Sequence, residues 1–427
     1  MNHIIKNYNQ LASSNNRQIV LDIVEAGLSA IITETIVNSS IQLNNGVLRI
    51  KDEDFELDKY KSIKLIGFGK VSGRAASAIS KILGDRINSA IIIDRKDPKL
   101  LEGTRSDSII KYSGSHPEPS LENFKFSENL INSVKSPDKD DLIIVIVSGG
   151  GSALFCWPEQ EFIDSKKLYD SFLATGQTIN ELNTVRKHIS LVKGGGLAKL
   201  LYPAKVIGLI FSDVPGDRYN QVASGPTYRD DSTIKDAQNI IDENNLGTFN
   251  LIETPKENKY FENVENIILA SNKIALEAMA QKAREFGIKV NIISDNIYDS
   301  ADEVISNFIK ASEPNSVILG GGEIRLKITG ESGSGGRNSY LAMKSIVNID
   351  NYTFCSIASD GSDNGDSAGA ISDKSTLAKI EQLGLNLNDY IENFDSFELF
   401  DKLGDIIFTG PTGSNVSDLM LLLNKDE

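Results

Sequence analysis

Residues 141–152 read DLIIVIVSGGGS, and this stretch decides the fold. Six consecutive apolar residues follow Asp141, a length and composition typical of a strand that is buried on both faces. Three glycines in a row then cost backbone entropy, which indicates that the backbone must turn sharply or approach a ligand closely. Backbone N–H groups that approach phosphate oxygens are the commonest reason for such a run. The stretch therefore predicts a buried strand that ends in an anion-binding loop made of Ser148, Gly149, Gly150, Gly151 and Ser152.

The same pattern recurs on both sides of this stretch. Short apolar runs that end in glycine or in a polar turn lie at residues 64–66, 205–211, 267–270, 317–319 and 353–358. Strand, turn and helix are the repeating unit of an α/β fold with a parallel sheet. Ligands of such sheets bind beyond the carboxyl ends of the strands, where these loops lie. Residues 15–39 read as one long helix, and the polar segment 250–263 is where we expect the chain to change domain.

Composition excludes several classes of protein. A chain of 427 residues is long enough for two or three domains. Its net charge of −15 disfavours sequence-independent binding of nucleic acid, although a local basic pocket can still accept an anionic substrate. Two cysteines and three histidines disfavour a disulfide framework and a Cys- or His-based metal site. No apolar run approaches the roughly 20 residues that cross a bilayer, and residues 1–10 do not read as a signal peptide. We therefore expect a cytoplasmic protein without a membrane or nucleic-acid partner.

A second glycine turn carries a lysine. Residues 67–73 read GFGKVSG, follow a strand and open a helix. Their spacing is one residue longer than the dinucleotide fingerprint, and they do not form a Walker A loop. A helix N-terminus with Lys70 beside it is suited to binding an oxyanion. The alternative is a tight turn with a solvated lysine.

Carboxylates follow two further strands. Residues 212–218 read SDVPGDR and place Asp213 at the end of a strand. Residues 359–366 read SDGSDNGD and place Asp360 and Asp363 in a glycine-rich loop. Oxygen ligands at strand ends suit Mg²⁺, which prefers one or two carboxylates together with phosphate oxygens and water. Aspartate is also common in turns for local reasons, so the coincidence of several such loops carries this prediction.

Three further motifs contain basic groups. Arg337 lies in a glycine-rich segment, and its guanidinium can bind a carboxylate or phosphate through two parallel hydrogen bonds. Residues 186–196 are basic and rich in glycine, which fits either an anion site or a helix end with a glycine cap. His116 lies in a stiff, proline-flanked turn, where a structural role is more common than a catalytic one.

Taken together, these motifs resemble the glycerate 2-kinase family, whose C-terminal half is called the MOFRL domain. The matching motifs follow the family's order along the chain, at residues 67–70, 114–119, 147–154, 185–188, 212–217, 223–227, 321–323, 335–338, 360–361 and 410–416. The resemblance implies ATP-dependent phosphorylation of D-glycerate to 2-phosphoglycerate, with Mg²⁺ or another divalent cation. It also implies a homodimer.

The resemblance further implies a larger Rossmann-like N-terminal domain, residues 1–255, and a smaller α/β C-terminal domain, residues 256–427. The active site of the family lies in the cleft between the two. Carried over by motif, the catalytic residues are Lys70, Asp213 and Arg337. Asp360 and Asp363 stand in the acidic loop as metal ligands, and Asn272 is the expected contact to the nucleotide.

These residues suggest a mechanism of phosphoryl transfer, which depends on positioning and on neutralising charge. Lys70 is expected to stabilise the oxygens of the phosphoryl group, and the loop of residues 148–152 to hold the phosphates of ATP. Arg337 is expected to bind the glycerate carboxylate or a phosphate. Asp213 is expected to accept the proton of the attacking hydroxyl or to hold the metal.

Two other functions remain open. An NAD(P)-dependent hydroxyacid or hydroxypyruvate oxidoreductase shares the sheet type, but it needs a G-x-G-x-x-G turn and a nearby ribose-binding acid, and the sequence offers neither. A non-catalytic protein that binds a nucleotide or a sugar acid would show binding without turnover.

Overall fold

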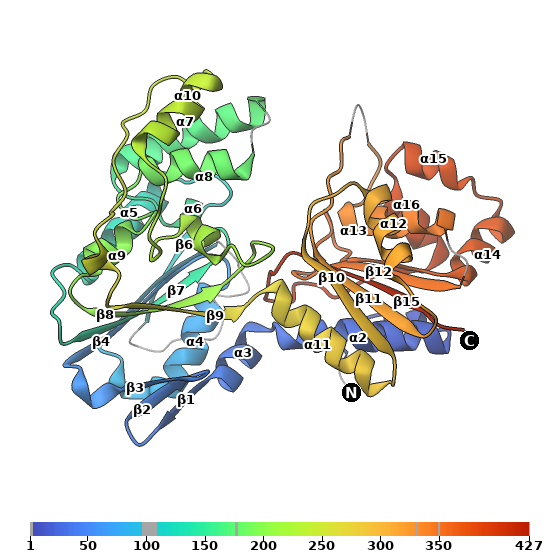
Figure 1. The fold of residues 1–427 in the computed structure, drawn as a ribbon, viewed down its shortest axis with the longest axis horizontal. Coiled ribbons are helices and arrows are strands. Elements are labelled where there is room, and N and C mark those ends of the chain that lie inside the picture. Colours follow the sequence, from blue (N-terminus) through green and yellow to red (C-terminus); the bar gives the residue numbers. More distant parts are fainter. Residues whose placement is uncertain (1–2, 96–108, 176–177, 329–331, 349–350, 427) are drawn as a thin grey trace. The chain divides into compact units, whose positions relative to one another are not determined.

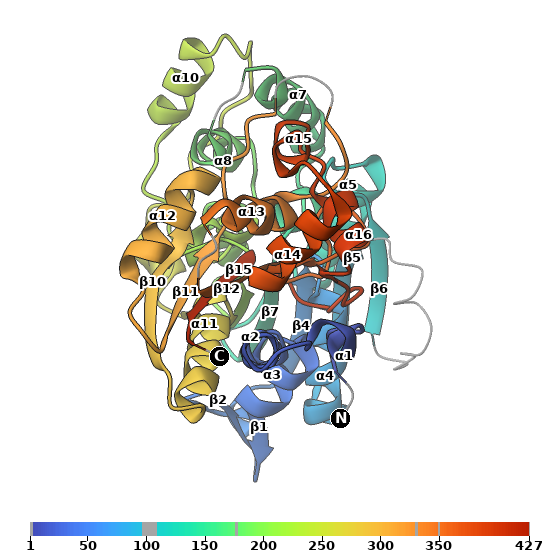
Figure 2. The same ribbon diagram turned by 90° about the vertical axis from the view of Figure 1, so that its right-hand side faces the viewer.

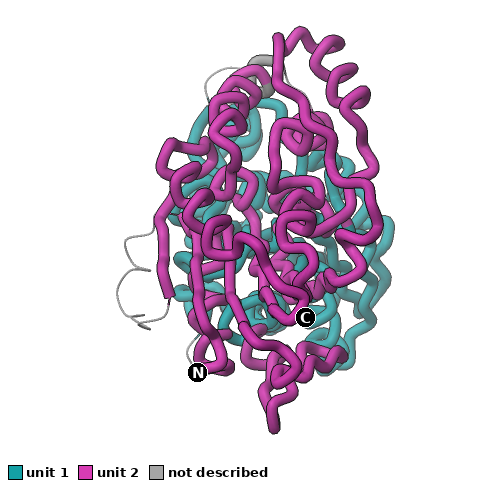
Figure 3. Tube along the Cα trace, turned by 90° about the vertical axis from the view of Figure 1, so that its left-hand side faces the viewer, with its two compact units in different colours: residues 1–35, 215–217, 270–427 teal, residues 36–214, 218–269 magenta. Residues whose placement is uncertain are grey.

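The computed structural model describes residues 3–95, 109–175, 178–328, 332–348 and 351–426, and the chain divides into two compact units (Figure 3). Unit 2 comprises Ile36–Val214 and Arg218–Leu269. Unit 1 comprises Met1–Thr35, Pro215–Asp217 and Ala270–Glu427. This division differs from the expected one in two ways. The main boundary lies at residues 269/270 instead of 255/256, and the first 35 residues belong with the C-terminal part of the chain.

Unit 2 is built on a six-stranded sheet (Figure 1). Its strands are β4 (Ser62–Phe68), β5 (Ser89–Arg95), β6 (Ile109–Gly114), β7 (Asp141–Ser148), β8 (Lys205–Phe211) and β9 (Val264–Ala270). The order across the sheet is β6-β5-β4-β7-β8-β9, and the pairs from β6 to β8 are parallel. The strands predicted at residues 64–66, 141–147, 205–211 and 267–270 are confirmed, and so is the α/β class.

Both faces of this sheet are covered, which explains the uninterrupted apolar run in β7. Helix α4 (Ser72–Leu83) contacts β4, β5 and β7 on one face, and α5 (Leu121–Ser133) contacts β5 and β6 on the other (Figure 1). Alternate residues of β7, such as Val145, enter the core that contains α5 and α9 (Gly196–Leu201). The residues between them, such as Ile146, are equally buried on the opposite face.

The other elements of unit 2 surround this sheet. A small antiparallel sheet contains β1 (Ile41–Asn44), β2 (Val47–Ile50) and β3 (Glu53–Glu56). The remaining helices are α6 (Gly151–Leu154), α7 (Glu159–Thr175), α8 (Ile179–His188) and α10 (Ile234–Glu243), with a 3₁₀ segment at Tyr219–Ser224.

Unit 1 contains a mixed sheet of order β10-β11-β15-β12-β13-β14. Its strands are β10 (Lys289–Ile297), β11 (Ser316–Gly322), β12 (Tyr352–Ala358), β13 (Gly369–Ser372), β14 (Ile406–Ile407) and β15 (Asp418–Asn424). Only β10 and β11 pair in parallel, because β15 lies between β11 and β12 and runs antiparallel to both. The strands expected at residues 317–319 and 353–358 are confirmed, but the sequence analysis did not anticipate β15.

Helices cover both faces of this second sheet. Figures 1 and 2 show α2 (Asn15–Ala30) and α11 (Asn272–Glu285) on one face and α12 (Ala301–Ala311), α13 (Arg337–Ser345) and α16 (Ser396–Leu403) on the other. The remaining helices of unit 1 are α1 (Tyr8–Leu11), α14 (Lys374–Leu383) and α15 (Leu387–Glu392), and α3 (Thr33–Ser40) begins in unit 1 and ends in unit 2. Among the described residues, no helix combines the length and the apolar character that crossing a bilayer requires.

Helix α2 is held in unit 1 by a buried ion-pair network around Arg17. Arg17 donates from Nε to Asp373 Oδ2 and from Nη1 to Asp405 Oδ1, both at 2.6 Å. The single helix predicted over residues 15–39 is wrong, because α2 ends at Ala30 and a second helix starts at Thr33.

Candidate active site

The strand order of the unit 2 sheet reverses between β4 and β7. β4 is the first of the six strands along the chain; β5 and β6 lie on one side of it, and β7, β8 and β9 on the other. In open parallel sheets the loops on the two sides of such a switch point diverge, and ligands bind there. The loops that leave β4 and β7 are the two glycine turns that the sequence analysis singled out. The topology therefore places the candidate site at these two loops.

The two loops pack directly against each other at Gly69. This residue has a φ of +117°, and a Cβ atom on it would lie 2.2 Å from the Oγ and 2.4 Å from the carbonyl oxygen of Ser148. The N–H of Lys70 donates to the carbonyl of Gly149 at 2.9 Å. Because only glycine allows this approach, Gly69 sets Lys70 beside the glycine loop.

Lys70 and His116 meet over Gly150. A Cβ on Gly150 would lie 2.9 Å from His116 Cδ2 and 3.1 Å from Lys70 Cγ, so both side chains border the same point of the loop. Partial shielding from water lowers the pKa of His116 to about 4, and the positive charges of Lys70, Arg95 and Arg186 act in the same direction. His116 is therefore neutral at pH 7 and can accept a hydrogen bond. The sequence indicated only weakly that His116 belongs to the site.

Asp213 lies against the same loop from the other side. It follows β8, the neighbour of β7 in the sheet. A Cβ on Gly149 would lie 2.0 Å from Asp213 Oδ2, so the carboxylate lies directly against the backbone of the loop. Lys70, the glycine loop and Asp213 are thus brought together at the carboxyl ends of three adjacent strands.

The N-terminus of α4 is already occupied by an anion of the chain itself. Asp94 Oδ2 accepts a hydrogen bond from the Gly73 N–H at 2.8 Å, and Oδ1 accepts one from the Arg95 N–H at 2.7 Å. Burial raises the pKa of Asp94 to about 6, although these two bonds act in the opposite direction. The expectation that this helix end receives an external oxyanion is therefore corrected. The groups left to bind one are Lys70 and the loop after β7.

The basic segment of residues 186–196 contains two cations with different surroundings. Lys193 is buried, and its Nζ donates to the carboxylate of Glu161 and, at 3.0 Å, to the carbonyl of Phe155. It is a structural ion pair that fixes the chain just after α6. Within the part of the chain that the structure describes, Arg186 has no carboxylate at ion-pair distance; its Nη1 donates to Asn183 Oδ1 at 3.2 Å.

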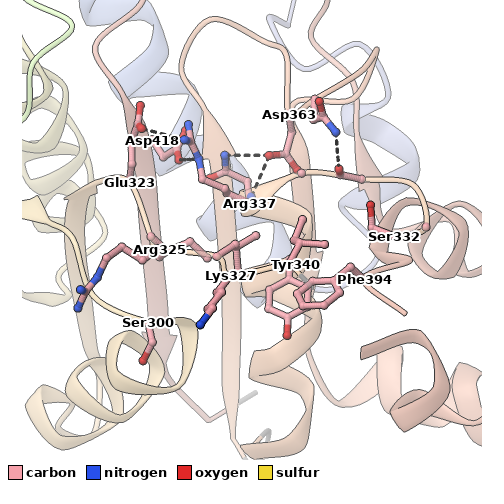
Figure 4. A pocket seen from close by; sticks show the side chains of 18 of the residues that line it. Ser300, Glu323, Arg325, Lys327, Ser332, Arg337, Tyr340, Asp363, Phe394 and Asp418 are labelled. Carbon is pink, nitrogen blue, oxygen red and sulfur yellow. Dashed lines mark hydrogen bonds and ion pairs between the residues drawn. The ribbon is translucent and has the colours of Figure 1, made fainter. Parts of the chain in front are cut away.

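Unit 1 contains a polar pocket of about 910 Å³ (Figure 4). Arg337, the first residue of α13, lines it and lies between two carboxylates. Its Nη1 is 2.8 Å from Glu323 Oε2, and its Nε is 3.4 Å from Asp418 Oδ2. Burial raises the pKa of Asp418 to about 7, although the charge of Arg337 acts to lower it. The positive charge of Arg337 is therefore already matched by acidic neighbours.

The two residues predicted as metal ligands have other partners. Asp363 Oδ1 accepts from the N–H and Nδ2 of Asn338, and Oδ2 accepts from the N–H and Oγ of Ser339, all at 2.7–3.2 Å. These bonds cap α13 and use both oxygens, so Asp363 is not available to a cation. Asp360 accepts a hydrogen bond from the Ser362 N–H at 3.0 Å. No cluster of three or more His, Cys, Asp or Glu side chains suited to a metal ion occurs among the described residues.

Asn272, the predicted nucleotide contact, begins α11 in unit 1. Its Nδ2 donates to the carbonyl of Asp295 at 2.6 Å, which ties the helix to β10. Its Oδ1 is buried and, within the described parts of the chain, has no hydrogen-bond partner. A contact between Asn272 and a nucleotide therefore stays a prediction.

The chain matches two family models. The model described as a domain of unknown function (DUF4147) matches residues 19–252, and the MOFRL family model matches residues 316–418. A D-glycerate 2-kinase of Thermotoga maritima is 31% identical over 428 residues, which cover 95% of this chain and 97% of the relative. A putative hydroxypyruvate reductase of Agrobacterium vitis is 32% identical, over 84% of this chain and 98% of the relative.

The fold has a counterpart among solved structures. The crystal structure of a glycerate kinase of Thermotoga maritima superposes with a TM-score of 0.83 at 29% sequence identity, covering 95% of this chain and 99% of the other.

Proposed function

Because the chain belongs to the glycerate 2-kinase family, we propose that it transfers the γ-phosphoryl group of ATP to the 2-hydroxyl of D-glycerate. The names of the relatives support the class of reaction. The observation in this chain that carries the proposal is the meeting of Lys70, the glycine loop and Asp213 at the switch point of the unit 2 sheet.

The cationic side of this site suits the phosphates of ATP. Lys70 supplies a compact positive charge beside the glycine loop, whose backbone N–H groups are the kind of donor that binds phosphate oxygens. Charge on the transferred group spreads over its oxygens in the transition state, and a fixed cation there lowers the barrier. We assign this role to Lys70 and to residues 148–152.

The acidic side suits the acceptor hydroxyl. In the transfer, the hydroxyl oxygen forms a bond to the γ-phosphorus while the bond from that phosphorus to the bridging oxygen of ADP breaks. The proton of the hydroxyl goes to Asp213, which the backbone of Gly149 holds next to the phosphate loop. Arg337 binds a further anionic group of the substrates, although Glu323 and Asp418 already balance its charge.

A divalent cation, Mg²⁺ in the proposal, fits this site as part of the nucleotide complex. One carboxylate at a strand end, together with phosphate oxygens and water, is a ligand set that Mg²⁺ accepts. Asp360 is the candidate for that carboxylate while Asp213 accepts the proton; the alternative is that Asp213 itself holds the metal. When bound, the cation neutralises phosphate charge. A homodimer and a cytoplasmic location belong to the same proposal, and light scattering after size-exclusion chromatography tests the assembly.

The oxidoreductase alternative lacks the G-x-G-x-x-G turn, because the glycines of residues 67–73 are spaced one residue further apart. In dinucleotide-binding sheets the pyrophosphate lies at the N-terminus of the helix after the first strand. Asp94 accepts from the Gly73 N–H at that helix end and lies at the end of β5, where dinucleotide-binding sheets carry an acid for the ribose, so its position does not count against this alternative. The non-catalytic alternative leaves the combination of Lys70, Asp213 and a neutral His116 without a use.

The experiment is an ADP-release assay with D-glycerate, ATP and Mg²⁺, followed by identification of the product by ³¹P NMR. We expect ADP formation that depends on glycerate and a single product, 2-phosphoglycerate. Parallel reactions with hydroxypyruvate and NADH or NADPH test the oxidoreductase. No ADP release with glycerate, hydroxypyruvate and related acids would refute the kinase, and binding without turnover would favour the non-catalytic protein.

A further inference from the structure

No carboxylate of the described residues pairs with the positive charge of Arg186. The residue lies in the last turn of α8 and is partly buried. Burial lowers the pKa of Arg186 to about 10, yet the group remains charged at pH 7. In the described residues no carboxylate lies within 4.0 Å of its guanidinium, and its one hydrogen bond goes to the neutral Oδ1 of Asn183. A charge that is partly withdrawn from water and has no paired carboxylate costs free energy, which a bound anion would recover.

A chain of hydrogen bonds connects Arg186 to the glycine loop. Asn183 Oδ1 accepts from Arg186 Nη1 at 3.2 Å and from Ser224 Oγ at 3.3 Å. Ser224 Oγ is in turn 2.8 Å from the Oγ of Ser152, the last residue of the loop. Three polar side chains thus orient the guanidinium relative to the loop that we assign to the phosphates of ATP.

Glu161 is the carboxylate that acts on Arg186, but it pairs with Lys193 and leaves the charge of Arg186 unmatched. Glu161 attracts Arg186, but its carboxylate is paired with Lys193, whose Nζ also donates to the Phe155 carbonyl. Lys193 and Glu161 balance each other, so the charge of Arg186 is the one that remains. The positive charges of Lys70, Arg95 and Arg186 all act to lower the pKa of His116, so Arg186 is within electrostatic reach of the ring that borders Lys70.

We propose that Arg186 binds the carboxylate of the acceptor sugar acid and thereby selects acids over neutral alcohols. The proposal rests on the proposed function. A planar guanidinium matches a carboxylate through two parallel hydrogen bonds, and a single negative charge balances the single charge left over. Lys70 and the backbone of the loop are the better match for phosphate oxygens.

The test compares Arg186→Met and Arg186→Lys with the wild-type enzyme and with a matched control, Arg229→Met. Arg229 lies in the same unit and is exposed, so its variant removes the same charge away from the site. We expect Arg186→Met to raise the KM for D-glycerate about 100-fold, the effect of losing hydrogen bonds to a charged group. The KM for ATP should stay within about threefold. Arg186→Lys should recover part of the loss because it keeps the positive charge but not the two parallel donors of the guanidinium.

A second readout does not depend on turnover. D-Glycerate without ATP should raise the Tm of the wild type and of Arg229→Met, but not that of Arg186→Met. If the wild-type enzyme does not phosphorylate glycerate, the proposed function itself is wrong. An active wild type with an unchanged glycerate KM in both Arg186 variants overturns the role of Arg186. A raised KM for ATP in place of glycerate also overturns it, because it assigns Arg186 to the nucleotide. If Arg186→Met does not fold, Arg186→Lys and the Tm shift decide.

Discussion

Substitution of Gly149 by alanine tests how closely the glycine loop positions Asp213. The new methyl would lie 2.0 Å from Asp213 Oδ2, whereas ordinary contact starts near 3.4 Å, so the carboxylate must move by about 1.4 Å. Misplacing a catalytic group by about 1 Å costs on the order of 100-fold in rate. We therefore expect kcat to fall about 100-fold, with a loss of about 1–3 kcal/mol in the free energy of unfolding from overpacking.

The measurement combines ADP-release kinetics with urea denaturation. Gly84→Ala is the control: its φ of +54° makes alanine unfavourable by about 1 kcal/mol, but nothing lies within 4 Å of the new methyl. It should lose stability and keep kcat. If Gly149→Ala acts through Asp213, the double variant with Asp213→Asn should be scarcely slower than Asp213→Asn alone. A kcat within threefold of wild type for Gly149→Ala, or fully additive effects, would refute the reasoning.

Four further outcomes are expected. Lys70→Ala should lower kcat by several orders of magnitude with little change in Tm, and near-normal turnover would remove Lys70 from the mechanism. Arg17→Met should cost about 3–5 kcal/mol in chemical denaturation because it leaves Asp373 and Asp405 buried without their cation; a loss below 1 kcal/mol would contradict this. Burial raises the pKa of Asp94 from 3.8 to about 6, so between these values the folded state holds a proton that the unfolded state lacks; the contribution of Asp94 to stability should fall by about 2 kcal/mol from pH 4 to pH 6 and be missing in Asp94→Asn, and an identical pH dependence in the variant would exclude it. EDTA should abolish activity and Mg²⁺ restore it, while calorimetry without nucleotide should detect no tight Mg²⁺ site; tight binding would contradict a cation that arrives with ATP.

The sequence predicted the parts of the fold that depend on local composition. The apolar run before Ser148 indicated a strand buried on both faces, and the glycines after it indicated a loop at the ligand-binding edge. Both predictions follow from rules that concern neighbours in the chain. The meeting of Lys70 and Asp213 at that loop also followed, because parallel strands bring their carboxyl ends to one edge.

What the sequence could not indicate depends on partners far along the chain. Asp94 stands near the end of a strand and Asp363 in a glycine-rich loop, and only the fold shows that they cap α4 and α13. β15 reads as a simple apolar end until it is seen between β11 and β12. Arg186 and Lys193 lie in one basic segment, and their difference appears only when Glu161 is found beside Lys193.

The ion pairs of Arg17 also bear on the order in which the molecule is made. Its partners Asp373 and Asp405 lie 356 and 388 residues further along the chain. The residues of unit 2 all lie between Arg17 and these two partners. During translation Arg17 of α2 therefore has no partner until the whole of unit 2 has been synthesised, which gives unit 2 time to fold first. Unit 1 can close only after the last strands have left the ribosome. A chain that ends before Asp373 would leave the apolar face of α2 uncovered and Arg17 without its two carboxylates.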